Sequence, residues 1–309
     1  MAYILATIHT PSWALPWWSA MVILNIISFL IGIFILFKSK RADNKEPKTA
    51  EYRSKMRVAG LIFITVALYR SIFVSSYPER ISWFESMANS PIIIRSLAFF
   101  AELAFAALIM WSLLNMNKDV PLPQKHKNNK ILNFLETKTP YVFFVFIFLA
   151  QFFAIGGLFT QYTILFALEE TFWGLSFLLI APLLVIKFKQ VFSNKDKKYK
   201  KEMTLYRSYL IIMVLFTFGY LIFQFAFALP VTLYSQIAAD MAKPHPTLMQ
   251  GIYYSIYNFT ATRDFETWGG WGFFIWHSGY FSILVWMVLL FMNGPRKLEV
   301  TNYNIKKGV

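Results

Sequence analysis

The sequence predicts an all-α membrane protein: a bundle of seven transmembrane helices, with the N-terminus outside and the C-terminus in the cytoplasm. Two observations lead to this fold class. Of the 309 residues, 57% are hydrophobic and 19% are aromatic, which is far more apolar than a soluble domain. These residues also gather in long runs that basic segments separate. We expect residues 1–309 to form a single transmembrane domain.

The spans follow from the length that a membrane requires. A helix needs about 20 mostly apolar residues to cross the hydrocarbon core. The segments that satisfy this rule are 14–37, 58–76, 91–114, 140–158, 162–186, 209–229 and 269–292. The fourth and fifth are separated only by a tight turn within GGLFTQY, which predicts two antiparallel neighbours. The longest loop, 230–268, is expected on the extracytoplasmic side, and its VTLYSQIAADMAK stretch predicts a surface helix.

The distribution of basic residues predicts the orientation. Of the 30 lysines and arginines, 25 fall in the loops after spans one, three and five or in the C-terminal tail. Only Arg80, Lys243 and Arg263 fall in loops on the opposite side. Because short cytoplasmic loops carry an excess of Lys and Arg, the basic side is expected in the cytoplasm. The protein is therefore expected in a cell or inner membrane, with anionic inner-leaflet lipids near its basic loops.

Composition excludes several function classes. The net charge of +14 does not indicate a nucleic-acid partner, because the basic residues alternate with apolar runs and form no continuous face. The absence of cysteine excludes disulfides, thiolate catalysis and cysteine-ligated metals. The last span has no lysine, which excludes a retinal Schiff base as cofactor. The motifs of the commonest G-protein-coupled receptors are absent, and four histidines are too few for a histidine-rich zinc site.

Ionisable residues inside the spans predict a polar pocket. Such residues are costly in a membrane, usually face the protein interior and mark functional sites. At about 1.5 Å per residue, Arg70, Arg95, Glu102, Glu169, Glu170 and His277 lie roughly 6 to 16 Å below the outer boundary. All of them fall in the outer half, on spans two, three, five and seven. This asymmetry favours a pocket that opens to the extracytoplasmic side.

Spacing gives this pocket some geometry. Arg95 and Glu102 are seven residues apart and should project from one face of span three. Glu169 and Glu170 should not both be ionised unless cations neutralise them, and Arg70 and Arg95 are the available cations. Trp173 follows the acid pair at helical spacing. The residues expected to cap or line the mouth are Glu79, Arg80, Arg263, Asp264, Glu266 and Trp271. For any one pair, a purely structural role remains open.

One short resemblance bears on chemistry. EETFWG at 169–174 and FFIWH at 273–277 resemble the Glu-Glu and Phe-x-x-x-His elements of the intramembrane CAAX-type prenyl proteases. The resemblance implies that Glu170 activates a water that His277 helps to bind, alone or with a metal. It covers about a dozen residues only; Gly174 stands where the family has an arginine, and no second histidine motif follows.

Three functions remain open from the sequence. In the first, the pocket binds a small polar or amphiphilic ligand in a receptor, binding or proton-linked transport role. In the second, the protein is an enzyme that acts on a lipid or lipid-linked substrate, with candidate catalytic residues Glu102, Glu169, Glu170 and His277. In the third, it is an accessory subunit of a membrane complex. Transport is the less favoured role for the pocket, because only Asn25 and Ser28 lead toward the cytoplasm.

Overall fold

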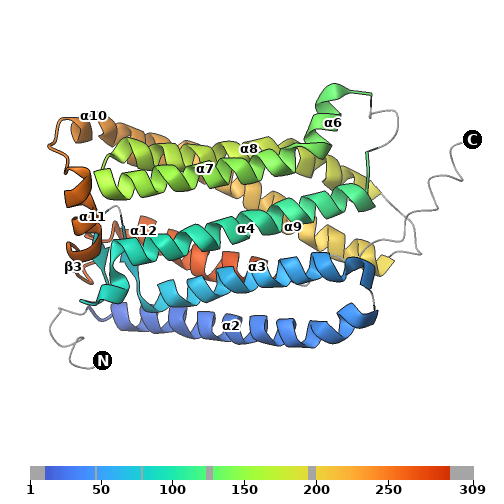
Figure 1. Ribbon diagram of the computed structural model, residues 1–309, viewed down its shortest axis with the longest axis horizontal. Coiled ribbons are helices and arrows are strands. Elements are labelled where there is room, and N and C mark those ends of the chain that lie inside the picture. Colours follow the sequence, from blue (N-terminus) through green and yellow to red (C-terminus); the bar gives the residue numbers. More distant parts are fainter. Residues whose placement is uncertain (1–10, 46, 78, 123–127, 194–199, 293–309) are drawn as a thin grey trace, which may run out of the picture.

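The computed structural model of the chain describes residues 11–45, 47–77, 79–122, 128–193 and 200–292. Its helices lie side by side in an elongated bundle whose two ends differ (Figure 1). One end carries the short strands β1 (Ser75–Ser76), β2 (Ile81–Ser82) and β3 (Thr260–Ala261), and we call it the sheet end. The opposite end carries the short helix α6 (Lys130–Thr137), and we call it the α6 end.

The chain passes back and forth between these two ends (Figure 1). The helices that do so are α2 (Ala14–Lys45), α3 (Pro47–Ile72), α4 (Pro91–Asp119), α7 (Thr139–Thr160), α8 (Thr163–Ser193), α9 (Lys200–Phe223) and the continuous run of α12 (Gly270–Ser278), η4 (Gly279–Leu284) and α13 (Val285–Met292). Between α7 and α8 the turn is tight, because Gln161 adopts a left-handed conformation (φ 61°) and caps α7.

Six helical runs of the described chain are long and apolar enough to cross a membrane. They are Ala14–Lys38, Pro91–Asp119, Thr139–Thr160, Thr163–Ser193, Tyr206–Met241 and Gly270–Met292. Helix α3 is not among them, because it ends at Ile72 and even its last 18 residues hold three charged side chains, Lys55, Arg57 and Arg70. The composition is that of a multi-pass membrane protein, and the span at 58–76 stays a prediction.

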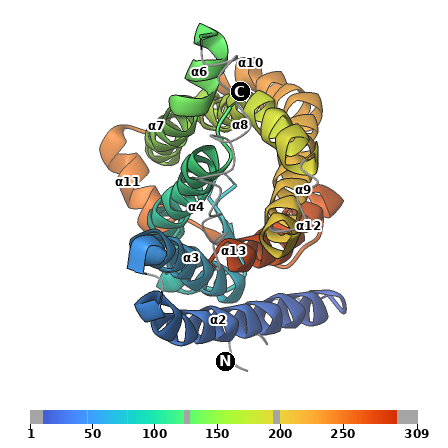
Figure 2. The same cartoon turned by 90° about the vertical axis from the view of Figure 1, so that its right-hand side faces the viewer.

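Most of these helices form a closed ring. Contacts link α3 to α4, α4 to α7, α7 to α8, α8 to α9, α9 to α13 and α13 back to α3. Figure 2 shows this arrangement from the α6 end, with α2 at the periphery, where it packs on α3 and α13. A continuous apolar core fills most of the ring, including Phe63, Phe105, Phe143 and Phe177, which are at most 2% exposed. A polar side chain inside this ring is therefore shielded from solvent and lipid alike.

The segment expected to begin the long loop is helical. Helix α9 continues through a π-helix, η3 (Gln224–Tyr234), into α10 (Ser235–Met241). Pro230 lies inside η3, where the wider turn lets the helix continue past a residue that would interrupt an α-helix. The VTLYSQIAADMAK stretch is thus an extension of span six and not a separate surface helix. A further helix, α11 (Leu248–Tyr257), follows it and packs on the end of α7.

An aromatic cluster closes the sheet end. Strand β2 pairs with β1 antiparallel and with β3 in parallel, which joins the chain after α3 to the chain before α12. Beneath this sheet Trp83 and Trp268 are 0% and 3% exposed, with ring centroids 5.9 Å apart. The cluster fixes the entry of both segments and positions the residues of the site below it.

Candidate functional site

A buried guanidinium organises the polar groups near the sheet end. Arg95, on the second turn of α4, is 1% exposed. Its Nη1 lies 3.2 Å from Glu102 Oε1 and 3.2 Å from Glu169 Oε1, and its Nη2 donates to Gln151. Two carboxylates on different helices therefore share one positive charge inside the ring, where such pairs are only weakly screened.

Local structure explains how these groups meet. Pro91 at the start of α4 sets the helix phase, and seven residues separate Arg95 from Glu102, so both project from one face. Gln151 of α7 donates through Nε2 to Glu102 Oε2 at 2.9 Å and to the Ile147 carbonyl at 3.1 Å. From the chain after α3, the Tyr77 hydroxyl accepts from Arg95 Nη1 at 3.4 Å. Each of the two acids thus contacts at least one donor from another helix, Glu102 through Gln151 of α7 and Glu169 through Arg95 of α4.

Glu170 occupies a separate position beside α9. Gln224 Nε2 donates to Glu170 Oε2 at 3.0 Å and to the Glu170 backbone carbonyl, also at 3.0 Å. The Tyr220 hydroxyl donates to the same Oε2 at 3.4 Å. Helix α8 and η3 approach closely here because Gly174 has no side chain; a Cβ there would lie 2.9 Å from the Phe225 ring. Gln224 is also the first residue of η3, and π-helical turns are frequent at functional sites.

We use the name carboxylate cluster for these two neighbouring groups together, which adjoin through the consecutive residues Glu169 and Glu170 of α8. The members are Tyr77, Arg95, Glu102, Gln151, Glu169, Glu170, Tyr220 and Gln224. The cluster holds three carboxyl groups and one guanidinium. Because unpaired charge is expensive in a buried site, the cluster must bind protons or a cationic group to approach neutrality. Its chemistry is therefore that of an acidic site, able to exchange protons or to pair with a positively charged ligand.

Two of the predicted residues lie outside this cluster. Arg70 is 6% exposed, and its guanidinium lies 5.4 Å from the centroids of both the Tyr280 and the Phe281 rings. In the described chain no carboxylate lies within 4 Å of it. His277 is 2% exposed among aromatic rings, with centroids 4.2 Å away at Phe281 and 5.1 Å away at Trp17. The protease resemblance implies that His277 and Glu170 act together. In the described chain, however, no hydrogen bond or ion pair joins them, and no group of three metal-ligand side chains includes them.

The residues predicted at the mouth also have other places. Arg263 is fully buried, donates to the Trp83 carbonyl at 3.0 Å and lies over the Trp83 and Phe84 rings. Burial lowers its pKa, although an arginine keeps its charge near neutral pH. Asp264 is exposed and accepts from the Thr267 backbone at 2.8 Å in a turn. These two residues shape the chain that enters α12 and do not line the cluster.

The remaining predicted residues are exposed or apolar in their contacts. Glu266 is exposed, and Trp271 is 73% exposed with its ring against Phe265. Trp173 is partly buried and stacks on Phe177 at 6.2 Å between centroids. None of the three donates a hydrogen bond to a carboxyl of the cluster.

Sequence reasoning missed three members of the cluster. Gln151, Tyr77 and Tyr220 carry no charge at neutral pH, so a search for ionisable residues passes over them. Gln151 left one signal: it is the only amide in the fourth predicted span. A buried amide on an otherwise apolar helix requires a polar partner, and this requirement predicts a position facing the interior.

A second polar group lies at the α6 end, which the sequence reasoning did not expect. The Tyr206 hydroxyl donates to Asp119, and Asn115 Nδ2 donates to Asp119 Oδ2 at 3.2 Å. Nearby, Lys187 Nζ lies 2.7 Å from Glu136 Oε1, and this lysine is fully buried. Asp119 and Lys187 lie outside the predicted spans but inside helices, because α4 and α8 extend beyond their predicted ends at residues 114 and 186.

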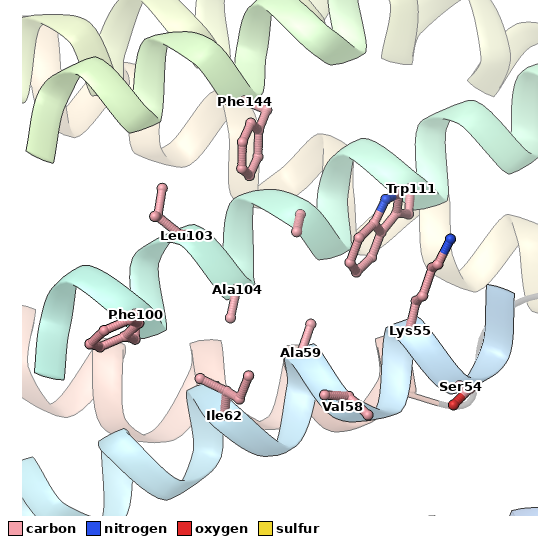
Figure 3. A pocket seen from close by; sticks show the side chains of 11 residues that line it. Ser54, Lys55, Val58, Ala59, Ile62, Phe100, Leu103, Ala104, Trp111 and Phe144 are labelled. Atoms are coloured by element: carbon pink, nitrogen blue, oxygen red, sulfur yellow. The ribbon is translucent and has the colours of Figure 1, made fainter. Parts of the chain in front are cut away.

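A cavity of about 480 Å³ lies on the outside of the bundle; its lining includes Phe100 and Leu103, which flank Glu102 in the sequence, but no member of the carboxylate cluster. It is a groove between α3 and α4 that Phe144 of α7 closes at one side (Figure 3). Its lining is apolar apart from Ser54 and Lys55, and Phe100 on its wall is 60% exposed. The shape and chemistry of the groove fit an acyl chain better than a polar solute.

Comparison with family models, with curated proteins and with solved structures finds no match to this chain. Among the described residues no group of three His, Asp or Glu side chains is arranged to hold a metal ion. Function must therefore be argued from the contacts of the carboxylate cluster itself.

Proposed function

We infer that this protein is a multi-pass membrane protein that binds a small polar or amphiphilic ligand at the carboxylate cluster. One observation supports this most strongly. Four helical segments and the chain after α3 direct polar groups to one buried place, and these groups include more acids than bases. A purely structural ion pair needs one acid for each base, whereas a site with an excess of carboxyl groups suits a ligand that carries a positive charge.

The membrane arrangement is part of the same proposal. With α3 counted as a span, the chain crosses seven times, and the antiparallel course of α2, α3 and α4 supports that count. The basic loops lie at the α6 end, so we place this end in the cytoplasm, beside anionic inner-leaflet lipids, and the sheet end outside. The carboxylate cluster then lies in the extracytoplasmic half of a cell or inner membrane.

A thermal-shift screen of the purified protein in detergent tests ligand binding. We would measure the Tm of three proteins, the wild type, Glu170→Gln and Glu51→Gln, in the presence of organic amines, metal cations, small anions or phospholipids. Glu51 is the matched control, because its side chain is 83% exposed at the opposite end of the bundle. We expect a cationic compound to raise the Tm of the wild type and of Glu51→Gln, and this shift to disappear in Glu170→Gln.

The opposite result has a clear meaning. If no compound shifts the Tm and Glu170→Gln melts well below the wild type in every condition, the cluster only holds helices together. The function would then reside in a partner protein, as expected for an accessory subunit.

The groove between α3 and α4 favours a second candidate, an enzyme that acts on a lipid substrate. Phe100 and Leu103 of the groove flank Glu102, whose side chain at 12% exposed is more accessible than that of Glu169 at 5%. An acyl chain in the groove would bring an anionic head group toward Arg95, with Glu102 as general acid or base. Incubation with phospholipids followed by mass spectrometry tests this reaction; unchanged lipids would count against it.

A further inference from the structure

Arg70 is a buried cation for which the carboxylate cluster does not account. It lies in the last turn of α3, is 6% exposed, and its guanidinium lies 5.4 Å from the centroids of the Tyr280 and Phe281 rings. Within the described chain the guanidinium makes no hydrogen bond and no ion pair. Ring faces attract its charge but leave its several N–H donors without acceptors. A charge buried in this way is costly inside a membrane protein unless an acceptor arrives.

Two polar groups beside Arg70 are also short of partners. The Tyr280 hydroxyl lies next to the guanidinium without reaching hydrogen-bond geometry, and no other described group bonds to it. His277 is 2% exposed and interacts electrostatically with Arg70, and its Nδ1 has no hydrogen-bond partner among the described residues. A hydroxyl and an imidazole can each donate a hydrogen bond. We call Arg70, His277 and Tyr280 together the Arg70 site; it offers donors and a positive charge, which suits an anion.

The π-helix η4 produces this arrangement. Consecutive residues of an α-helix point about 100° apart. Tyr280 and Phe281 are consecutive in η4, yet both rings face Arg70. The Phe281 carbonyl accepts from Asn25 Nδ2 of α2 at 2.9 Å, so a second helix holds the irregular turn in place. Such turns are frequent at functional sites.

The Arg70 site adjoins the carboxylate cluster. The Tyr280 hydroxyl interacts electrostatically with Glu102 and Arg95 as well as with Arg70. Glu169 also interacts with Arg70, although the two lie beyond ion-pair distance. The cluster has more acids than bases, whereas the Arg70 site has a base and no acid. Two opposite excesses of charge therefore lie side by side inside the ring of helices.

We propose that the Arg70 site binds the anionic group of a zwitterionic ligand whose amine occupies the carboxylate cluster. This inference rests on the proposed function, from which it takes the positive end of the ligand. Arginine binds carboxylate and phosphate groups through two parallel hydrogen bonds, and the Tyr280 hydroxyl adds a third donor. A zwitterion compensates both excesses at once, whereas a simple amine leaves Arg70 without an acceptor. The ligand class is thus an amine that carries a carboxylate or a phosphate.

Calorimetric titration of the purified full-length protein in detergent tests this with two pairs of probes. β-alanine carries a carboxylate where propylamine has a methyl group, and phosphoethanolamine carries a phosphate that ethanolamine lacks. We expect the wild type to bind the zwitterion of at least one pair roughly 10- to 100-fold more tightly than its amine, as for a hydrogen bond to a charged group. The pair that shows this preference distinguishes carboxylate from phosphate.

Variants assign the preference to the Arg70 site. Arg70→Gln should bind the two members of a pair equally, and Tyr280→Phe should lose part of the preference while it still binds the amine. Lys189→Gln removes a positive charge from an exposed position of α8 and should keep the whole preference. Size-exclusion chromatography and Tm establish that each variant is folded. If Arg70→Gln is not folded, Tyr280→Phe decides.

The outcomes separate this inference from the proposed function. Equal binding of zwitterion and amine by the wild type would overturn the inference and leave a cation site at the carboxylate cluster. A folded Arg70→Gln or Tyr280→Phe with the full wild-type preference would overturn it too, as would a wild type that binds none of the probes. Acetate or inorganic phosphate that binds Glu170→Gln but not Arg70→Gln would support the anion site even if amines do not bind.

Discussion

At the scale of single residues, Arg95 determines whether the carboxylate cluster can exist. Its guanidinium contacts Glu102 and Glu169 at 3.2 Å each, and in the described chain no other cation lies within ion-pair distance of these two acids. Removing one partner of a buried ion pair leaves an uncompensated charge, which is far more costly than replacing the whole group by neutral side chains. The stability of the bundle should therefore depend on the balance of charge and not on the number of polar groups.

Arg95→Met is expected to lower the free energy of unfolding by about 3 to 5 kcal/mol, the usual cost of breaking a buried pair. Thermal unfolding in detergent measures this, with Lys189→Met as a control at an exposed site of α8. The triple variant Arg95→Met, Glu102→Gln, Glu169→Gln should recover most of the loss. A triple variant no more stable than Arg95→Met alone would show that charge balance is not what Arg95 provides.

The sequence predicted which of these residues lie near the same end of the bundle better than the direction in which each side chain points from its helix. The rise per residue places Arg95, Glu102 and Glu169 within about 10 Å of one another along the bundle, and the structure joins them. His277 has a similar predicted depth but faces aromatic rings instead of the acids. The direction of a side chain around its helix depends on tilt and on local unwinding, such as the π-helix η4 that follows His277. One sequence gives no measure of either.

At the scale of elements, apolar length identified the long helices, but tertiary contacts decided the rest. Helix α11 has 10 residues, too few for a stable isolated helix, and it is held by packing on α7. A Cβ added at Gly251 of α11 would lie only 1.6 Å from the Phe159 carbonyl oxygen. Such an approach between two backbones cannot be predicted from helical periodicity, so the sequence reasoning assigned this segment to a loop.

Gly251→Ala should therefore displace α11 from α7 and lower the Tm measured in detergent. Gly219→Ala is the matched control, because this helical glycine has nothing within 4 Å of an added Cβ. Alanine also has the higher helix propensity, so the control should be neutral or stabilising by roughly 0.5 to 1 kcal/mol. If both variants keep the wild-type Tm, α11 is not held by the close contact that the structure shows.

At the scale of the whole molecule, the two ends differ in charge and in construction. The sheet end is sealed by aromatic packing around Trp83 and Trp268, whereas the α6 end holds the buried Lys187–Glu136 pair. Basic loops tend to stay on the cytoplasmic side of a membrane, so the charge predicts that the α6 end faces the cytoplasm. The aromatic cluster at the other end packs the outer loops against the bundle. The distribution of charge predicts this polarity from sequence alone, because it depends on composition and not on the packing of individual side chains.

Cysteine labelling in intact cells tests both the orientation and the number of spans. The natural chain has no cysteine, so an introduced one is labelled without background. Glu85→Cys and Glu266→Cys, exposed at the sheet end, should react with a membrane-impermeant maleimide from outside. Asn128→Cys, exposed at the α6 end, should react only after the membrane is permeabilised. The seventh span is α3, and Glu51→Cys near its start should be labelled from the side opposite to Glu85→Cys after its end. Labelling of both from the same side would show that α3 does not cross and would rule out seven spans. Labelling of Asn128→Cys alone in intact cells would reverse the proposed orientation, and with it the direction in which the carboxylate cluster faces.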